Sequence, residues 1–280
     1  MSRVAVVGAG TMGNGIAHVF AQAGWDTVLI DSSADALGRG MAAIKKNTDR
    51  QVTKGGLTAD QRRELLGRIT KSTALEVARD CEVVVEAATE NPAIKFKIFA
   101  DLGRLAPPSA VLASNTSSIS ITEIAKHTDR PAQVIGMHFM NPVPVMKLVE
   151  LIRGKETSSE TVKKTVDIAQ QLGKVPVEVN DAPGFVSNRV LMPMINEAIF
   201  CVQDGIATAG GVDEVMKLGM NHPIGPLALA DLIGLDVCLS IMKVLQDGLD
   251  TQKYRPAPLL EQMVAAGQLG RKSGQGFYAY

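Results

Sequence analysis

The beginning of the chain carries the pattern that most constrains its fold. Residues 4–7 are the apolar run Val-Ala-Val-Val, and they lead directly into Gly-Ala-Gly-Thr-Met-Gly at residues 8–13. A second apolar run, residues 27–30, ends at Asp31. A strand, a glycine-rich turn, a helix and a second strand that ends in a carboxylate are typical of a dinucleotide-binding unit.

Each glycine of this turn has a separate physical task. Gly8 permits the tight turn, Gly10 allows the backbone to approach a pyrophosphate, and Gly13 allows the helix to pack close to the strand. The backbone N–H groups at the helix start, where Thr11 and Met12 lie, would then face the phosphates.

Asp31 bears on the choice of cofactor. It lies eighteen positions after Gly13, near the spacing expected for a carboxylate that accepts a hydrogen bond from a ribose 2′-hydroxyl. The same carboxylate would repel a 2′-phosphate, so NAD is favoured over NADP, although Ser32 and Ser33 could tolerate some NADP. FAD is the main rival ligand, because some flavin proteins begin in the same way.

The composition excludes several classes of protein. Lys and Arg total 29 and Asp and Glu total 29, so the net charge is zero, and we expect no nucleic-acid partner and no membrane surface as partner. The zero net charge does not exclude a local basic site that binds a phosphorylated ligand. The chain has no basic-then-apolar leader and no apolar run of membrane-spanning length, so we expect a cytoplasmic protein.

The three cysteines and the histidines indicate no metal site. Cys81, Cys201 and Cys238 are odd in number and far apart, which favours buried free thiols in a reducing compartment. No cluster of Cys and His has the spacing of a metal site. We therefore expect no bound metal.

The rest of the chain predicts an α/β fold with two domains. Apolar runs expected to be strands occupy residues 81–87, 110–113, 134–139, 147–152 and 175–179, and helices are expected at residues 92–105 and 158–172. This alternation predicts a mostly parallel, doubly wound Rossmann-type sheet, with residue 176, a proline, in an edge strand. Residues 34–70 are expected to form an inserted helical pair. The pattern is helical from residue 184 onward, so we predict an NAD-binding domain at 1–183 and an all-α substrate and dimerisation domain at 184–280.

One histidine is placed for acid–base chemistry. In an open parallel sheet, ligands bind beyond the carboxyl ends of the strands, and among the four histidines His138 alone lies at such an end. A histidine base needs a partner that fixes its tautomer and stabilises the imidazolium. Glu150, in an apolar run, could return beside it after one turn. The alternatives are a structural histidine and a carboxylate on the solvent face of a strand.

Two polar segments are further candidates for ligand contacts. Residues 114–118, Ser-Asn-Thr-Ser-Ser, end a predicted strand and could supply hydroxyl and amide hydrogen bonds; the alternative is a turn in which Ser118 or Ser120 caps the next helix. Asn188, at the start of the first helix of the second domain, could face the cleft, or could merely cap or pack.

These segments together resemble the 3-hydroxyacyl-CoA dehydrogenases, most closely the short bacterial 3-hydroxybutyryl-CoA dehydrogenases. The resemblance covers the full length of the chain. The segments that carry it are residues 8–13, 114–118, 138–150 (His-Phe-Met-Asn-Pro-Val-Pro-Val-Met-Lys-Leu-Val-Glu), 183–189 and 270–278.

The resemblance implies an oxidoreductase that interconverts (S)-3-hydroxyacyl-CoA and 3-ketoacyl-CoA with NAD(H), in fatty-acid β-oxidation or butanoate metabolism. It implies that His138 is the base and that Glu150 is its orienting partner. It also implies that Ser117 and Asn188 hold the substrate oxygen. The NAD contacts that it implies are Asp31, Glu90, Lys95, Asn115, Asn141 and Lys272. It places the CoA phosphates near Lys54, where a solvated lysine is the alternative, and it implies a homodimer through the second domain.

Two other functions are considered. A related dehydrogenase that acts on a free hydroxy acid or sugar acid, without CoA, would share the glycine turn and a similar histidine. A dinucleotide-sensing or structural protein would keep the fold without turnover, but the joint presence of His138, Glu150, Ser117 and Asn188 argues against it.

Overall fold

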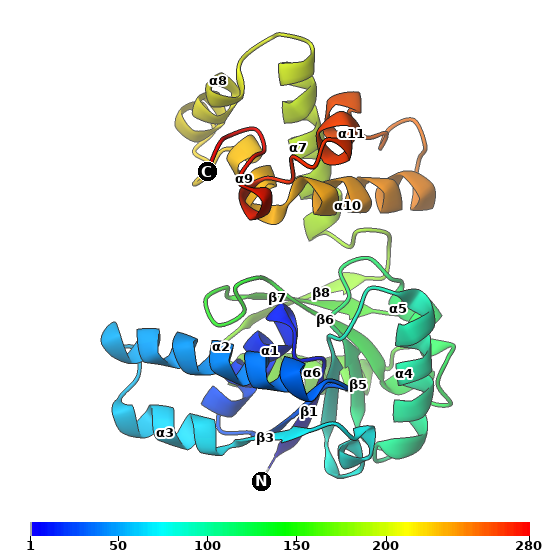
Figure 1. The fold of residues 1–280 in the computed structure, drawn as a ribbon. Helices are drawn as coiled ribbons and strands as arrows, with labels where there is room; N and C mark the ends of the chain where they lie inside the picture. Colours follow the sequence, from blue (N-terminus) through cyan, green and yellow to red (C-terminus); the bar gives the residue numbers. More distant parts are fainter. Residues whose placement is uncertain (1) are drawn as a thin grey trace. The chain divides into compact units, whose positions relative to one another are not determined.

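The computed structural model describes residues 2–280, which form two compact units divided in sequence between Asp181 and Ala182 (Figure 1). The boundary predicted from the sequence lies two residues later, after residue 183. The first unit is an α/β layer structure and the second is helical, so the predicted fold class is confirmed.

An eight-stranded sheet forms the first unit, in the order β3-β2-β1-β4-β5-β6-β7-β8. Neighbouring strands run parallel except β6 and β7, which are antiparallel. The strands are β1 Arg3–Val7, β2 Asp26–Ile30, β3 Ile69–Ser72, β4 Val83–Glu86, β5 Val111–Ser114, β6 Val134–Phe139, β7 Leu148–Arg153 and β8 Val175–Asn180. The strand that contains Pro176 lies at an edge, as its missing N–H predicts.

Each helix of this unit after the first begins at a side chain that accepts a hydrogen bond from one of its first backbone N–H groups. Thr58 and Gln61 form a reciprocal capping box at one of them, and Ser33, Asn91 and Ser158 cap three others. The helices are α1 Thr11–Gln22, α2 Ala34–Thr53, α3 Ala59–Gly67, α4 Pro92–Leu105, α5 Ile121–Ala125 and α6 Ser159–Gln171, with 3-10 turns η1 Leu75–Asp80 and η2 Pro131–Gln133. The predicted helical pair is α2 and α3.

The core of the first unit forms where helices cover the sheet. Val4 and Val6 of β1 pack in one apolar cluster with Ile16 and Phe20 of α1, and none of the four is exposed. Burying an apolar side chain of this size contributes about 1.5–3 kcal/mol to folding. This packing holds α1 directly after the glycine turn.

One feature of the sheet differs from the expectation, and another agrees with it. Residues 69–72 form strand β3, whereas the pattern predicted helix up to residue 70. This strand is polar and sits at the sheet edge, where only Ile69 is buried, so it lacks an apolar signal. The strand β7 reverses direction after a short turn, as the proposed return of Glu150 toward His138 requires.

The second unit is a helical bundle with its own core. Its helices are α7 Ser187–Gln203, α8 Ala209–Glu214, α9 Pro226–Ile233, α10 Leu235–Gly248 and α11 Pro258–Ala265, with a π-helical turn at Val215–Gly219 (η3) and a 3-10 turn at Arg271–Ser273 (η4). Apolar side chains from α7, α9, α10 and α11, among them Ile195, Leu227, Leu245 and Leu260, form one buried cluster. No strand longer than an isolated bridge occurs in residues 182–280.

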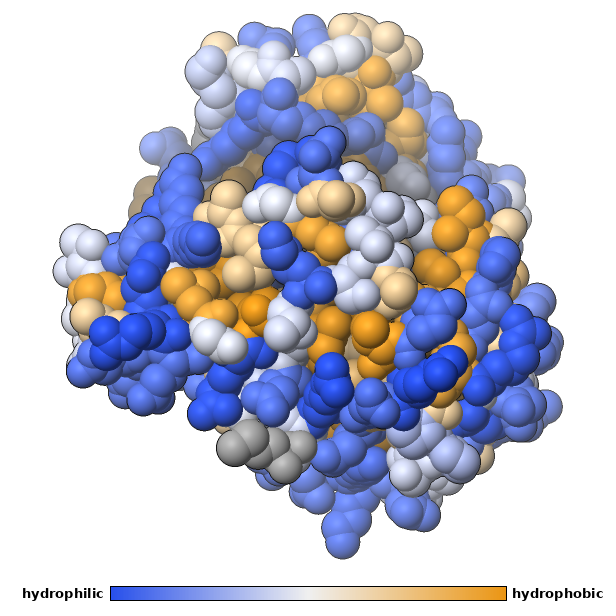
Figure 2. Space-filling view, turned by 60° about the horizontal axis from the view of Figure 1, so that its bottom comes forward, coloured by the Kyte–Doolittle hydropathy of each residue, from blue (hydrophilic) through white to orange (hydrophobic). Residues whose placement is uncertain are grey.

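Figure 2 shows one face of the molecule, on which hydrophilic side chains predominate and apolar ones form separate patches. Within residues 2–280, none of the helices has the length and apolar character needed to cross a bilayer.

Candidate active site

The glycine turn after β1 has the geometry that its sequence predicts. Gly8 has a φ of +102°, and a Cβ there would lie 2.5 Å from the backbone of Ala88. A Cβ on Gly13 would lie 1.7 Å from the carbonyl oxygen of Gly8. A Cβ on Gly10 would point into open space, with no heavy atom within 4 Å. Gly8 and Gly13 therefore serve the protein's own packing, while Gly10 leaves room for something outside it.

Asp31 is tied to this turn. Its carboxylate accepts hydrogen bonds from the backbone N–H of Ala9 at 2.8 Å and of Ser33 at 2.9 Å. One carboxylate thus joins the end of β2 to the glycine turn, where a ribose attached to a pyrophosphate at Gly10 would lie.

A pocket of about 270 Å³ opens beside the turn, lined by Gly10, Thr11, Met12, Ala87, Ala88, Thr89, Glu90, Lys95 and Asn115. The N-cap of α1 is Gly10, which has no side chain to satisfy the first N–H groups of the helix. Uncapped N–H groups at a helix start are a ready site for phosphate. The residues present therefore fit NAD.

A buried ion pair lies below this pocket. Lys95 of α4 pairs with Glu86 at the end of β4, and their side chains are 1% and 0% exposed. The hydroxyl of Ser114, at the end of β5, donates to Glu86 at 3.0 Å. A buried charge needs such partners. The pair fixes the place of the Lys95 ammonium on the pocket floor.

The predicted contact between His138 and Glu150 is formed. The register of β6 and β7 sets His138 opposite Glu150, and His138 Nδ1 lies 2.8 Å from Glu150 Oε2. Both residues are buried, at 8% and 2% exposure. The carboxylate engages Nδ1, so proton exchange with a substrate would use Nε2. Glu150 is therefore not a carboxylate on the solvent face.

The polar segment after β5 contacts both the strand end beside His138 and a residue that lines the pocket beside the glycine turn. Asn115 Oδ1 accepts from the backbone N–H of Phe139 at 2.9 Å, which links it to the strand end beside His138. Glu90 accepts from the Thr116 hydroxyl at 2.6 Å and from the Ser117 N–H at 2.9 Å. Ser120, one of the two predicted caps, caps α5. The segment therefore serves as both a polar contact site and a helix start.

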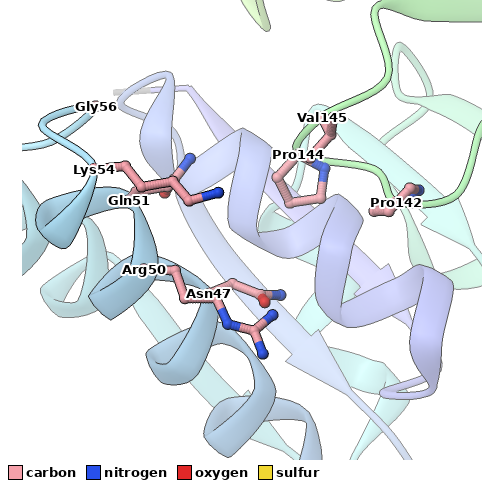
Figure 3. A pocket seen from close by; sticks show the side chains of 8 residues that line it. All are labelled: Asn47, Arg50, Gln51, Lys54, Gly56, Pro142, Pro144 and Val145. Atoms are coloured by element: carbon pink, nitrogen blue, oxygen red, sulfur yellow. The ribbon is translucent and has the colours of Figure 1, made fainter.

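A second pocket in this unit, of about 340 Å³, lies between α2 and the turn that joins β6 to β7. Figure 3 shows its two sides, which are α2 with the residues after it and the proline-containing turn. The lining residues are Asn47, Arg50, Gln51, Lys54, Gly56, Pro142, Pro144 and Val145. Two cations beside an apolar turn suit a ligand with an apolar stem and phosphate groups.

A buried histidine holds the α2 side of this pocket. His18 of α1 is fully buried, and its Nε2 lies 3.0 Å from Gln51 Oε1. Gln51 in turn donates to Gln22 at 3.4 Å. Burial lowers the pKa of His18 below its ordinary value of 6.5, with the hydrogen bond to Gln51 opposing the shift. His18 is thus a packed helix residue that also anchors α2.

Comparison with known proteins assigns the family. The profile of the 3-hydroxyacyl-CoA dehydrogenase NAD-binding domain matches residues 3–182, and that of the 3-hydroxyacyl-CoA dehydrogenase C-terminal domain matches residues 184–280. The chain belongs to the 3-hydroxyacyl-CoA dehydrogenase family. The resemblance stated from the sequence is confirmed.

Relatives in this family match over the whole chain. A probable 3-hydroxybutyryl-CoA dehydrogenase of Bacillus subtilis is 56% identical over 100% of this chain and 98% of its own length. A 3-hydroxybutyryl-CoA dehydrogenase of Bradyrhizobium diazoefficiens is 52% identical over 100% and 96%. The crystal structure of an (S)-3-hydroxybutyryl-CoA dehydrogenase from Ralstonia eutropha has a TM-score of 0.97 at 50% identity, covering 100% of this chain and 99% of that one.

Two residues to which the resemblance gives roles in the 3-hydroxyacyl-CoA dehydrogenases lie in the second unit. Asn188 is buried in the first turn of α7, whose N-cap is Val186, so it is not the capping residue. Lys272 donates to Asp236 at 2.5 Å. Their roles toward substrate and NAD stay predictions, as do those of the other site residues. Within residues 2–280 no group of His, Cys, Asp and Glu could hold a metal ion.

Several residues of this dehydrogenase fold were not singled out from the sequence. Glu86 ends an apolar run, and Glu150 lies within one. A carboxylate among apolar neighbours needs a partner, so the reasoning that singled out Glu150 could also have found Glu86. Arg50 and Gln51 lie in a polar helix, where side chains that line a pocket look like any solvated face. Lys174 follows Gly173 before a strand and gives no signal that it is buried.

Proposed function

We propose that this chain interconverts short-chain (S)-3-hydroxyacyl-CoA, such as (S)-3-hydroxybutyryl-CoA, and the corresponding 3-ketoacyl-CoA, acetoacetyl-CoA, with NAD(H). One observation carries the proposal. The buried His138–Glu150 pair lies at the carboxyl end of β6, and the glycine turn lies at the carboxyl end of β1 in the same sheet. Acid–base and cofactor groups therefore share one edge of the sheet.

In the oxidation, His138 removes the proton from the substrate 3-hydroxyl through Nε2. Glu150 keeps Nδ1 protonated and stabilises the imidazolium that forms. NAD held by the residues of the glycine turn would supply the acceptor for the hydride of C3. In the reverse direction His138 returns the proton to the same oxygen, so one residue serves as base and acid.

The remaining site residues bind and orient. Ser117 and Asn188 hold the substrate oxygen, and Asp31, Glu90, Lys95, Asn115, Asn141 and Lys272 hold NAD. Lys54, with Arg50 beside it in the second pocket, meets the CoA phosphates. A guanidinium and an ammonium at one pocket suit a ligand with several phosphate groups.

We further propose a cytoplasmic homodimer that acts in fatty-acid β-oxidation or butanoate metabolism. The second unit exposes large apolar side chains, among them Ile206 at 72%, Leu218 at 83% and Met220 at 61%, and a partner copy would cover such a surface. The cysteines Cys81, Cys201 and Cys238 are free thiols, as expected in a reducing compartment. A dominant monomer at micromolar concentration by light scattering would contradict the dimer.

The test follows NADH oxidation with a panel of 3-ketoacyl-CoA substrates of rising chain length, with NADPH as the alternative cofactor. We expect acetoacetyl-CoA to be reduced far faster than free acetoacetate, and NADH to be preferred over NADPH. Faster reduction of free acetoacetate would favour the dehydrogenase without CoA. No turnover of any ketone would favour the sensing protein.

A further inference from the structure

Lys174 is a buried cation that the reaction described above does not use. It lies between α6 and β8 and is 8% exposed. Its Nζ donates to the carbonyl oxygen of Val143 at 2.5 Å and of Met146 at 2.7 Å. Among the described residues no carboxylate forms an ion pair with it, and desolvation lowers its pKa. Burying a charge without an ion-pair partner costs free energy, which hydrogen bonds to the ammonium must offset.

Both carbonyl groups belong to the turn that joins β6 to β7. Two of its residues, Pro142 and Pro144, have no N–H group, so the turn forms few internal hydrogen bonds. The backbone N–H groups of Val145 and Met146 both donate to the carbonyl oxygen of Pro142. The carbonyls of Val143 and Met146 take their donor from Lys174, which is 31 and 28 positions away. Without it, two carbonyl groups would lose a charged donor.

The same turn forms one side of the pocket assigned above to the CoA part of the substrate. Pro142, Pro144 and Val145 face Lys54 and its neighbours on α2 across this pocket (Figure 3). The His138–Glu150 pair, in contrast, is held by the ladder between β6 and β7. The support for the pocket wall and the support for the acid–base pair are therefore separate.

We propose that Lys174 is a positioning residue for the CoA part of the substrate, because its ammonium fixes the turn that forms one wall of the CoA pocket. This inference rests on the proposed function. It requires that loss of the ammonium weakens binding of the CoA thioester while the chemical step, which the β6–β7 ladder supports, stays nearly unchanged.

The test is Lys174→Met, which keeps an unbranched apolar stem and removes the donors. We expect KM for acetoacetyl-CoA to rise about tenfold, because two carbonyl groups lose a charged donor, while kcat stays within about twofold of wild type. Lys174→Arg keeps a charged donor and should restore most of the affinity. The matched control is Lys164→Met, a half-buried lysine of α6 that also donates to a backbone carbonyl, that of Ser109, but lies outside the pocket; it should leave all constants unchanged.

A truncated substrate separates positioning from a general structural role. Acetoacetyl-N-acetylcysteamine lacks the nucleotide and most of the pantetheine, so Lys174→Met should reduce it with nearly the wild-type kcat/KM. An unchanged KM for acetoacetyl-CoA, or equal losses with both thioesters, overturns the inference. If Lys174→Met does not fold, Lys174→Gln, which keeps one donor, is measured in the same way, and an unchanged KM overturns it. If the wild type does not reduce acetoacetyl-CoA, the proposed function itself fails.

Discussion

Replacing Glu150 by Gln removes the charge of the buried His138–Glu150 pair and keeps its shape. Two unit charges about 4 Å apart, at the effective dielectric of a protein site, interact with roughly 4 kcal/mol. The amide oxygen of Gln can still accept from Nδ1, and a neutral hydrogen bond retains about 1 kcal/mol of this. The variant therefore loses about 2–3 kcal/mol of stabilisation when the imidazolium forms, which corresponds to a loss in kcat of roughly 30- to 200-fold.

The assay is steady-state reduction of acetoacetyl-CoA by NADH, followed across a range of pH. We expect kcat to fall by more than KM changes, because the charge matters in the transition state and not for binding. The matched control is Glu178→Gln in the neighbouring strand β8, where the carboxylate is exposed and pairs with Arg153; it should change kcat by less than about twofold. A kcat for Glu150→Gln within about threefold of wild type, or an unchanged pH–rate profile, would refute the reasoning.

Three further outcomes follow from the same structure. His138→Gln should bind NAD as tightly as wild type by fluorescence titration but lose at least about 100-fold in kcat, and a nearly normal kcat would show that another group is the base. Gly13→Ala should unfold at a much lower temperature than wild type, because its Cβ would lie 1.7 Å from the Gly8 carbonyl oxygen. Gly10→Ala, whose Cβ would meet no heavy atom within 4 Å, should keep its Tm and raise KM for NAD. Equal losses of Tm in the two variants would contradict this contrast. Because burial lowers the pKa of His18, the unfolded chain takes up a proton first as pH falls through 6.5, so stability decreases below that pH. In urea unfolding, His18→Gln should therefore lose less stability than wild type between pH 7.5 and 5.5. An equal loss would assign the acid sensitivity to other groups.

Much of the site could be predicted because its signals are local. The turn at residues 8–13 carries its conformational requirements in three glycines, and the helix Pro92–Leu105 begins at a proline where the pattern predicts it. His138 and Glu150 are only 12 positions apart in sequence, so one tight turn between two apolar runs was enough to suggest their contact. Residues 69 and 70, the first two of β3, were wrongly taken as helix because an edge strand with one buried residue has no apolar alternation.

The amino-acid sequence alone determined the fold class, the family and which side chains could carry out acid–base chemistry, because periodicity and turn residues act over a few positions. Only the tertiary structure decided which groups meet across the sheet, such as Glu86 with Lys95 below the cofactor pocket and Lys174 with the carbonyls of Val143 and Met146. Sequence periodicity tells which face of an element is buried, but not which distant side chain it meets there. Contacts between a side chain and a backbone carbonyl about 30 residues away have no sequence signature, because every residue carries a carbonyl group.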